Sequence, residues 1–464
     1  MKLILEKGSY RDPSGKVFYH EEKVYRGLTK EGVRRFNSIK DKGVIEESIS
    51  KGFLVETKIV NNDFFAKHFE EFDIFLEHKQ INFISYPYEW TFDQLKDAAL
   101  HHLNFQIFLL EKNCVLIDAS AYNVQFINTK PVFIDVLSIE SYVEGSYWYG
   151  HKQFCENFLN PLLLNSKKNI SFNNWFRGNL EGIPTSDTNS ILSFKDKLSP
   201  GIFTHVYLLD KLHKKTIENP KQTIEKLSKQ NKITKETYRF ILINLQKLIK
   251  KLKTNKVKST WQDYSTNNTY SSNDESIKKK IISDFSKKNN FNLLADLGCN
   301  NGMYSFVSLN SGSRNVVGFD YDLKALNNAY IFAKKNNLNF QGIYMDATNP
   351  SPNQGWDESE RKNLFSRSKF DGIIALALIH HLCIAKNIPL EEAINWLVSY
   401  APKGIIEFVP KNDETIKRML QIRKDIFTQY NKENFEKLLN KKAKITYMQK
   451  VSSSGRTLYE YSKI

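Results

Sequence analysis

The last third of the chain alternates apolar runs of strand length with amphipathic stretches of helical length. The apolar runs cover residues 292–298, 315–320, 339–346, 370–378 and 404–410, and the helical stretches include KALNNAYIFAKKN and EEAINWLVSYA. Apolar strands that alternate with helices predict a parallel sheet with helices on both faces. Two further strand-like runs, KITYMQK and TLYEYSK, follow, and the short turn KVSSSGR between them predicts that they pair as an antiparallel hairpin. We therefore expect an open α/β sheet from residue 291 onward.

Three successive strands of this sheet end in an acidic residue: Asp296, Asp320 and Asp346. The first strand continues into Gly298 and Gly302, where a buried strand turns into a helix. Glycine suits a sharp turn at which a ligand comes close to the backbone. In open α/β sheets, ligands bind beyond the carboxyl ends of the strands. The sequence therefore predicts a ligand site over these three strand ends.

The combination of DLGCNNG, VVGFD, GIYMDA and FDGIIALALIHHL resembles the class I S-adenosylmethionine-dependent methyltransferases over about residues 290 to 464. The resemblance implies that Asp320 accepts hydrogen bonds from the ribose hydroxyls of the cofactor. It also implies that Asp346 and the amide of Ala347 hold the adenine, and that Asp296 orients the glycine loop or the methionine amino group. The remaining cofactor-site candidates are Cys299, Asn300, Tyr321 and Ala375. A similar α/β fold that binds another ligand is the alternative.

The fourth strand ends in ALALIHHL and lacks the Asn/Asp-Pro-Pro-aromatic motif of the amino-methylating enzymes in this superfamily. This argues against nucleic-acid and protein-amide acceptors. His380 and His381 follow that strand, and an imidazole with a pKa of about 6.5 can take the proton of a hydroxyl acceptor. We expect O-methylation of a small-molecule or glycan-type acceptor with one of them as base, His380 being slightly preferred. Either histidine could instead cap the strand end or bond to the backbone.

Further residues on loops near the same face are candidates for substrate contact. They are Trp356, Glu360, Arg361, Glu407, Lys411 and Arg456. The motifs YPYEW, DASAYNVQF, FIDVLSIE, GWDESER and IEFVPKND follow one another along the whole chain. Their order is similar to that in a family of bacterial two-part proteins that includes the rhizobial nodulation protein NoeA. This second resemblance implies methyl transfer and names no acceptor.

Residue composition and the pattern of apolar residues divide the chain into three parts. Residues 1–165 mix β-rich runs (KVFYHEEKVYRGL, FLVETKIV, NFISYPY, PVFIDVLSI) with a helix over 91–113, which predicts an α+β domain. Residues 166–260 form a basic helical segment, with loop punctuation at SFNNWFRGNLEGIPTSDTN. The stretch STWQDYSTNNTYSSNDES marks the boundary to the Rossmann-like, seven-stranded methyltransferase domain over 261–464.

The segment LIDASAYNVQFINTKPVFID, residues 116–135, resembles the catalytic loop of protein kinases and their small-molecule relatives. Asp118, Asn123 and Asp135 match the proton-accepting Asp, the magnesium-binding Asn and the second metal-binding Asp, the last reached through a hairpin. The resemblance implies a kinase-like first domain that binds Mg-ATP, with Asp118 as base. Arg26 or Lys23 could replace the phosphate-binding lysine.

This segment also departs from the kinase pattern. Leu116 stands where a histidine is expected, Val136 and Leu137 replace the Phe-Gly that follows the second Asp, and no Gly-x-Gly phosphate loop is present. The alternative interpretation is a scaffold in which Asp118 caps a turn and Asp135 bonds to backbone amides.

The net charge of +16 is concentrated in residues 211–260, which hold fifteen Lys or Arg and three Glu. Tyr238, Ile241, Leu245, Leu248 and Leu252 recur there at helical spacing, so the lysines should occupy the solvated side of a helix. Few aromatic residues are interleaved, which argues against a nucleic-acid partner.

Cellular location and metal content follow from two further features of the sequence. The N-terminus lacks a secretory signal, and no apolar run is long enough to span a membrane, so we expect a cytoplasmic protein. The four cysteines show no Cys-x-x-Cys motif or Cys/His cluster, which argues against a zinc site.

Three functions remain open at this point. The first is a methyltransferase whose kinase-like half binds substrate or nucleotide without chemistry. The second is a bifunctional enzyme that phosphorylates and methylates one acceptor. The third is an RNA-binding methyltransferase that uses the basic helices.

Overall fold

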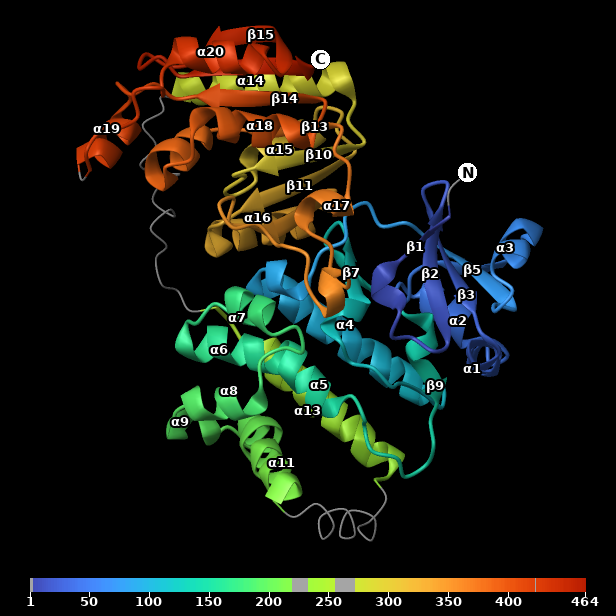
Figure 1. Ribbon diagram of the computed structural model, residues 1–464. Coiled ribbons are helices and arrows are strands. Elements are labelled where there is room, and N and C mark those ends of the chain that lie inside the picture. The colour runs from blue at the N-terminus through green and yellow to red at the C-terminus, as the bar shows by residue number, and fades with distance from the viewer. Residues whose placement is uncertain (1–2, 219–232, 255–271, 422) are drawn as a thin grey trace.

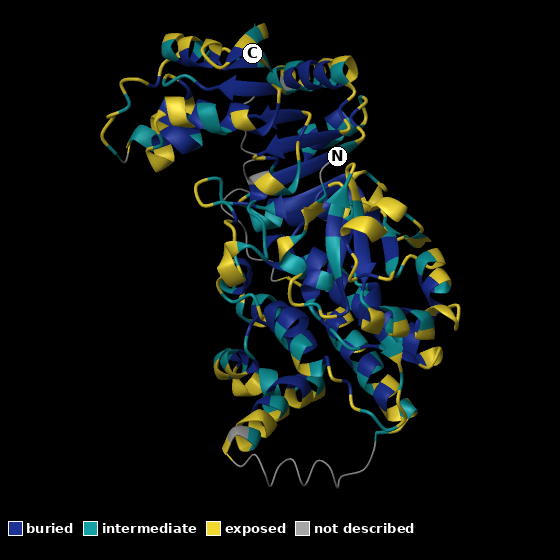
Figure 2. Cartoon of the chain, turned by 45° about the vertical axis from the view of Figure 1, so that its right-hand side comes forward, coloured by how far each residue is buried: buried dark blue, intermediate teal, exposed yellow. Residues whose placement is uncertain are grey.

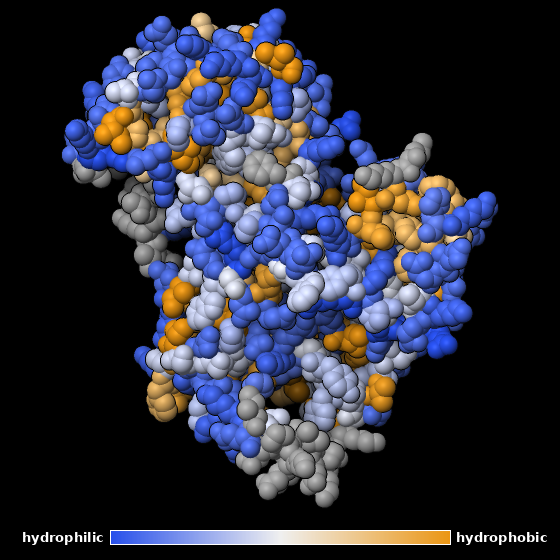
Figure 3. Space-filling view, in the orientation of Figure 1, coloured by the Kyte–Doolittle hydropathy of each residue, from blue (hydrophilic) through white to orange (hydrophobic). Residues whose placement is uncertain are grey.

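The computed structural model describes residues 3–218, 233–254, 272–421 and 423–464. We call the described residues before 255 the N-terminal half and residues 272–464 the C-terminal domain. The two are stacked end to end, with the C-terminal domain at the top of Figure 1. Most of the boundary stretch STWQDYSTNNTYSSNDES and much of the lysine-rich region lie outside the described residues. Hydrophilic residues cover most of the face shown in Figure 3.

The C-terminal domain is built on one mixed sheet of seven strands, in the order β12-β11-β10-β13-β14-β16-β15. The strands are β10 (Leu293–Leu297), β11 (Asn315–Asp320), β12 (Phe340–Tyr344), β13 (Gly372–Ala375), β14 (Lys403–Phe408), β15 (Ala443–Lys450) and β16 (Thr457–Lys463). Strands β10 to β14 are parallel, and β16 runs antiparallel to both of its neighbours. The predicted parallel sheet and its terminal hairpin are confirmed, and the domain is Rossmann-like.

Helices cover both faces of this sheet because successive side chains of each strand point to opposite sides. Leu294 packs with residues of α14, α15 and α16, whereas Ala295 packs with residues of α18 and α20. Figure 2 shows the central strands buried between these layers. The helices are α14 (Ser272–Asn289), α15 (Met303–Leu309), α16 (Leu323–Lys335), η8 (Trp356–Glu358), α17 (Leu364–Arg367), η9 (His381–Ala385), α18 (Leu390–Tyr400), α19 (Glu414–Gln421) and α20 (Lys432–Asn440).

The N-terminal half begins with a five-stranded antiparallel sheet, in the order β1-β2-β3-β5-β4. Its elements are β1 (Ile4–Leu5), η1 (Lys7–Ser9), β2 (Gly15–His20), β3 (Lys23–Leu28), α1 (Lys30–Lys40), α2 (Val44–Ser50), β4 (Thr57–Val60), α3 (Asp63–His68) and β5 (Ile74–His78). After η2 (Pro87–Glu89), the long helix α4 (Phe92–Glu111) confirms the helix predicted over 91–113. A capping box of Thr91 and Gln94 fixes its start.

Two small strand pairs and a group of helices complete this half. Strand β6 (Cys114–Leu116) pairs with β9 (Ile139–Ser141), and β7 (Val124–Ile127) pairs with β8 (Lys130–Phe133) as the predicted hairpin. The short helices of the first half are η3 (Ala121–Asn123) and η4 (Val136–Ser138). The later helices are α5 (His151–Phe154), η5 (Cys155–Leu159), α6 (Asn160–Lys168), α7 (Asn173–Gly178), α8 (Thr185–Ile191), α9 (Phe194–Lys197), α10 (Pro200–Ile202), η6 (Phe203–Leu208), α11 (Leu209–Glu218) and α13 (Lys235–Lys251).

One β-rich run of the sequence is not a strand. The stretch NFISYPY forms a loop that leads into η2. The backbone N–H and C=O of Ser85 bond to the side-chain amide of Gln125, at 3.0 and 2.9 Å, and not to a neighbouring strand. The prediction of a strand here was wrong because a side chain replaces the strand partner.

The two parts of the chain share their apolar interiors. The core of the N-terminal half runs from Leu28 through α4 to Leu252 and also includes Tyr330 of α16. Phe83 of the N-terminal half lies in turn in the core formed with α18 and α20. The buried residues of α13 pack in the first of these cores, as its helical spacing predicts.

A buried ion pair joins the same two parts. Arg367 of α17 donates two hydrogen bonds to Glu89 of η2, at 2.7 and 2.6 Å, and each side chain is 1% exposed. Among the residues described, no helix has both the length and the apolar character needed to cross a bilayer.

Candidate functional site

The glycine turn after β10 combines three residues in left-handed backbone conformations. Gly298 and Gly302 have φ of 80° and Asn300 has φ of 50°. A Cβ added at Gly298 would find its nearest heavy atom at 3.8 Å, whereas one at Gly302 would meet the ring of Phe306 at 2.7 Å. Gly302 is therefore required by packing, and Gly298 leaves room for a ligand to approach the backbone.

Asp320, at the end of β11, holds the glycine turn. Its Oδ2 accepts the N–H of Asn300 and its Oδ1 accepts the N–H of Asp322, both at 2.7 Å. Burial raises the pKa of Asp320 to about 6, although these backbone donors favour the charged form. A carboxylate oxygen can accept more than one hydrogen bond. Asp320 can therefore bind the donors of a ligand while it keeps the turn in place.

Asp296, at the end of β10, lies deeper in the site and is 3% exposed. Ser305 Oγ donates a hydrogen bond of 2.6 Å to its Oδ2. Burial raises the pKa of Asp296 to about 7, and the charge of Asp320 acts in the same direction. The two carboxylates are therefore electrostatically coupled on adjacent strand ends, as the sequence predicts.

The other candidates surround this pair in different ways. Asp346 follows β12 and accepts hydrogen bonds from the N–H and Oγ1 of Thr348, at 2.9 and 2.7 Å. Tyr321 is 60% exposed, with its ring 5.9 Å from that of Tyr344. Cys299 is buried in the core below the turn, Ala375 is buried at the end of β13, and Ala347 is partly buried.

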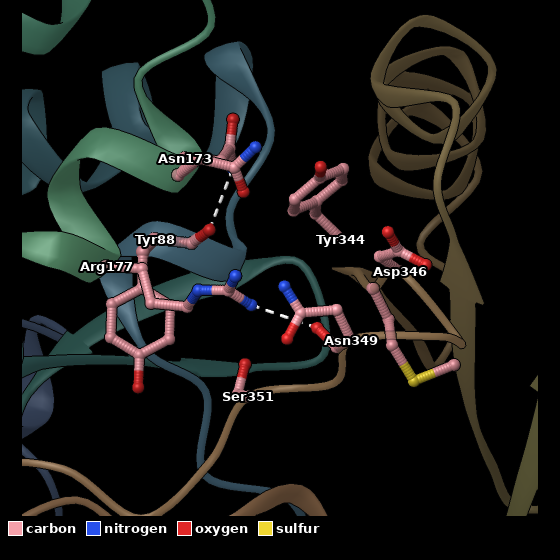
Figure 4. A pocket seen from close by; sticks show the side chains of 9 residues that line it. Tyr88, Asn173, Arg177, Tyr344, Asp346, Asn349 and Ser351 are labelled. Carbon is pink, nitrogen blue, oxygen red and sulfur yellow. Dashed lines mark hydrogen bonds between the residues drawn. The ribbon is translucent and has the colours of Figure 1, made fainter.

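A small pocket lies next to Asp346, where the two parts of the chain meet (Figure 4). It is lined by Tyr88, Asn173, Asn174, Arg177, Tyr344, Met345, Asp346, Asn349 and Ser351. Asn173 donates to the carbonyl of Tyr88 at 2.9 Å, and Arg177 donates to the carbonyl of Asn349 at 3.0 Å. Sequence reasoning missed the α7 residues because SFNNWFRG was interpreted as a loop.

His380 and His381 differ in their surroundings. His380 is fully buried, and neither of its ring nitrogens has a hydrogen-bond partner among the residues described. Burial lowers its pKa well below the ordinary value, and His381 and Arg456 add to the effect. His381 is half-buried, and burial lowers its pKa to about 4. Both imidazoles are therefore neutral at pH 7, with ring centroids 4.2 Å apart.

Two of the predicted substrate contacts, Glu407 and Arg456, belong to a buried ion network beside these histidines. Lys278 Nζ lies 2.7 Å from Glu407 Oε1, and the N–H of Ala377 donates to Glu407 Oε2 at 3.0 Å. Arg456 donates two hydrogen bonds of 2.7 Å to Asp413. All four charged side chains are at most 3% exposed. Glu407 and Arg456 are therefore paired with opposite charges inside the fold, whereas the sequence predicts them on loops in contact with substrate.

The other predicted contacts lie elsewhere. Glu360 accepts hydrogen bonds from Tyr10 and Arg11 of the N-terminal half, and the guanidinium of Arg361 lies 4.0 Å from the ring centroid of Tyr122. Lys411 pairs with Asp425 at 2.8 Å, and Trp356 is 70% exposed. The GWDESER loop therefore contacts the N-terminal half.

The residues that match the kinase pattern lie at the base of the β7–β8 hairpin, where the N–H of Ile134 bonds to the carbonyl of Asn123 at 2.9 Å. Asn123 donates a hydrogen bond of 2.9 Å to Asp118. Burial raises the pKa of Asp118, and the charge of Asp135 acts in the same direction. Burial would raise the pKa of Asp135 as well, but Arg26, at 2.5 Å, holds it below its ordinary value.

Arg26 and Lys23, the two candidates for a phosphate-binding cation, have different surroundings. It is buried on β3 and bridges Asp135 and Asp12, whereas Lys23 is exposed and pairs with Glu77. The guanidinium of Arg26 therefore supplies a cation next to Asp135.

The cysteines differ from the sequence prediction in one case. All four are free and buried. Cys155, however, lies beside His151 and His205, with the ligand atoms of all three within 4.8 Å of one another. The prediction that no Cys/His cluster exists was wrong, because His205 comes from a separate helix; the spacing of His151 and Cys155, four apart, is the signal in the sequence.

Comparison with known proteins gave one full-length match. The chain is 41% identical over 457 residues to nodulation protein NoeA of Rhizobium meliloti (strain 1021), covering 98% of this chain and 95% of that protein. No family model matches.

Solved structures match about half of the chain. The PH0226 protein of Pyrococcus horikoshii OT3 covers 45% of this chain and all of its own, at 20% identity and a TM-score of 0.33. Magnesium protoporphyrin IX methyltransferase of Synechocystis PCC 6803 covers 48% of this chain and 95% of its own, at 17% identity and a TM-score of 0.31. N-methyltransferase NodS of Bradyrhizobium japonicum WM9 covers 41% of this chain and 96% of its own, at 13% identity and a TM-score of 0.31.

Proposed function

This chain belongs to the family of nodulation protein NoeA, and on that premise we propose that it is an S-adenosylmethionine-dependent methyltransferase that O-methylates a small-molecule or glycan-type acceptor. The observation that carries the proposal is the site over the strand ends. There, the open backbone at Gly298 lies beside two coupled carboxylates, Asp296 and Asp320. A ligand with hydroxyl and amino donors and a flat ring fits such a set.

The residues present fit this cofactor. Asp320 would accept hydrogen bonds from the ribose hydroxyls, and Asp346 with the amide of Ala347 would hold the adenine. Gly298 would let the cofactor lie against the backbone, and Asp296 would face its amino group. When bound, S-adenosylmethionine supplies a methyl group activated by a sulfonium centre. Arg177 of the N-terminal half lines the pocket beside Asp346, so this half would lie next to the adenine of a bound cofactor.

For the proton of the acceptor hydroxyl, we favour His381 over His380. His381 is half-buried and its pKa of about 4 keeps a ring nitrogen free of a proton at neutral pH. His380 is fully buried, and the charges of Arg456, Asp413 and Lys278 act on its pKa. The absence of an Asn/Asp-Pro-Pro-aromatic motif supports an oxygen acceptor.

Asp320→Ala is expected to weaken S-adenosylmethionine binding roughly ten- to a hundredfold, because ligand donors would lose an acceptor worth about 1 to 3 kcal/mol. Isothermal titration calorimetry measures the change, and the exposed Asp284→Ala is the control. Gly298→Val, which puts a β-branched residue at φ of 80°, should also weaken binding. Full-strength binding by both variants would contradict the assignment.

Methyl transfer is tested separately from cofactor binding. Release of S-adenosylhomocysteine in the presence of oligosaccharide or small hydroxylated acceptors would support the reaction. Binding without release for every hydroxylated class tested would contradict O-methylation and leave the cofactor site standing.

A second proposal concerns the kinase-like half, for which bifunctional phosphorylation and methylation is the alternative to a binding role. The Asn123–Asp118 hydrogen bond and the opposed pKa shifts of Asp118 and Asp135 favour a functional site. The guanidinium of Arg26, however, already neutralises Asp135. We therefore favour a role in binding without phosphoryl transfer.

The melting temperature with and without Mg-ATP tests this half. A rise that disappears in Asn123→Ala would support a nucleotide site with Asn123 and Asp135 as magnesium ligands. No rise would leave residues 116–135 as scaffold.

The remaining alternative is RNA binding through α13 and its neighbouring helices. A salt-dependent mobility shift of labelled RNA would support it.

A further inference from the structure

Three metal-ligand side chains meet in the helical part of the N-terminal half. His151 Nε2 lies 2.9 Å from His205 Nδ1, and Cys155 Sγ lies 3.7 Å from His151 Nε2. Cys155 and His205 are buried, and His151 is half-buried. None of these residues belongs to the strand-end site or to the Asp118 loop.

Local backbone structure explains why these atoms converge. His151 and Cys155 are four residues apart on the continuous helical stretch α5–η5, so they share one face. The wider π-helical turn η5 begins at Cys155, and His205 lies in a second π-helical turn, η6. Such turns are rare and often occur at functional sites. Here two of them present ligand atoms to each other.

We propose that His151, Cys155 and His205 bind a divalent cation of the zinc type. Imidazole and thiolate are the ligands that zinc prefers. Tetrahedral bonds of the usual lengths place nitrogen ligands about 3.3 Å apart and a nitrogen and a sulfur about 3.6 Å apart. The Cys155–His151 distance of 3.7 Å is close to that value, and the two histidines need to separate by only about 0.4 Å.

The protonation states suit this chemistry. A hydrogen bond between His151 Nε2 and His205 Nδ1 needs one nitrogen as donor and one as acceptor, so one of the two already has a lone pair available. Cys155 binds a cation as the thiolate. Cation binding would break the His151–His205 hydrogen bond and release the Cys155 proton to solvent.

The position of the cluster gives the cation a role in the fold. Gln153 and Asn157 lie on the same helical stretch and accept hydrogen bonds from the N–H groups of Ala119 and Ala121, at 2.8 and 3.1 Å. The helical stretch that carries two of the ligands therefore also holds the Asp118 loop. A cation that ties it to η6 braces that loop, and the three ligands leave a fourth position for water or an anion.

Cobalt substitution tests the proposal on the full-length protein. The protein is stripped with a chelator, titrated with CoCl₂ and followed by absorption spectroscopy. We expect a thiolate-to-cobalt charge-transfer band that saturates at about one cobalt per chain and is displaced by zinc. Cys155→Ser should remove the band, whereas Cys114→Ser, which changes another buried cysteine, should keep it.

Two results of the cobalt titration would overturn the proposal. One is the absence of a saturable band in the wild-type protein, and the other is a band that survives in folded Cys155→Ser. If Cys155→Ser does not fold, as judged by circular dichroism, His205→Gln takes its place and should keep the thiolate but lose stoichiometric binding. If neither variant folds, the zinc content of the desalted wild-type protein decides: about one zinc per chain supports the site and none overturns it.

Discussion

Replacing Arg367 by alanine is expected to lower the free energy of unfolding by about 3 to 5 kcal/mol, because it leaves the carboxylate of Glu89 buried without its cation. Glu89 is 1% exposed, and both of its oxygens accept from Arg367. Arg367 also donates to the carbonyl of Ile84 at 2.9 Å and stacks over the ring of Tyr86 at 4.5 Å. The variant therefore loses hydrogen bonds and packing together.

Urea denaturation measures this effect. The control is Lys417→Ala, which removes an ion pair with Glu414 in which the side chains are 54% and 60% exposed. An exposed pair of this kind is worth at most about 1 kcal/mol. Equal losses in the two variants would show that the Glu89–Arg367 pair does not hold the two parts together.

Acid should destabilise the protein between about pH 6.5 and pH 4 through neutral histidines that are buried or half-buried. His78, His101 and His381 have pKa values lowered to about 4 by burial, and that of His102 is lowered to about 3. The unfolded chain binds these protons near pH 6.5, so below that value it takes up more protons than the folded chain. Stability is therefore full above pH 6.5 and falls as the pH drops, by roughly 2 kcal/mol per histidine at pH 5.

The raised pKa values of Asp296 and Asp320 partly offset the loss of stability in acid. A substitution of His102 isolates the part of this loss that comes from one histidine. The His102 ring lies among the rings of Phe133, Trp148, Phe154 and Phe158, with centroids 5.5 to 6.4 Å away. Neither of its nitrogens has a hydrogen-bond partner among the residues described.

His102→Phe should match the wild-type protein at pH 8 and retain about 2 kcal/mol more stability at pH 5. Denaturation series at the two pH values measure the difference, and His68→Phe, at an exposed position, is the control. An unchanged pH dependence in His102→Phe would contradict the assignment of the acid loss to buried imidazoles.

The sequence predicts the C-terminal domain well because its signals are local. Alternation of apolar strands and helices fixes the sheet, and the acidic strand ends place Asp296 and Asp320 on neighbouring strands. The hairpin between Asn123 and Asp135 is likewise a short-range feature. Each of these predictions depends on residues within one strand, turn or helix.

What the sequence could not predict depends on contacts between distant segments. Alternation along β3 puts Lys23 and Arg26 on opposite faces, yet only the packed structure shows which face meets Asp135. Glu89 and Arg367 are 278 residues apart, and His205 is 54 residues from His151. Such pairs carry no periodic signal, so the Glu89–Arg367 ion pair and the metal-ligand cluster could be found only in the folded structure.

Each of the two cores contains one aromatic ring from the other part of the chain, and this limits how the protein can be divided into fragments. Tyr330 reaches into the N-terminal half, where its hydroxyl donates to Asp97 at 2.6 Å, and Phe83 fills a place beneath the C-terminal sheet, 5.7 Å from the ring of Phe319. A fragment ending before residue 255 would lack the first ring, and one beginning at 272 would lack the second. Each excised piece would expose to water the apolar surface that the missing ring covers, and a buried aromatic side chain covers roughly 150 to 250 Å². Neither part is thus an independent unit. If it were fused alone to another protein, it would need another side chain in place of the aromatic ring that the other part supplies.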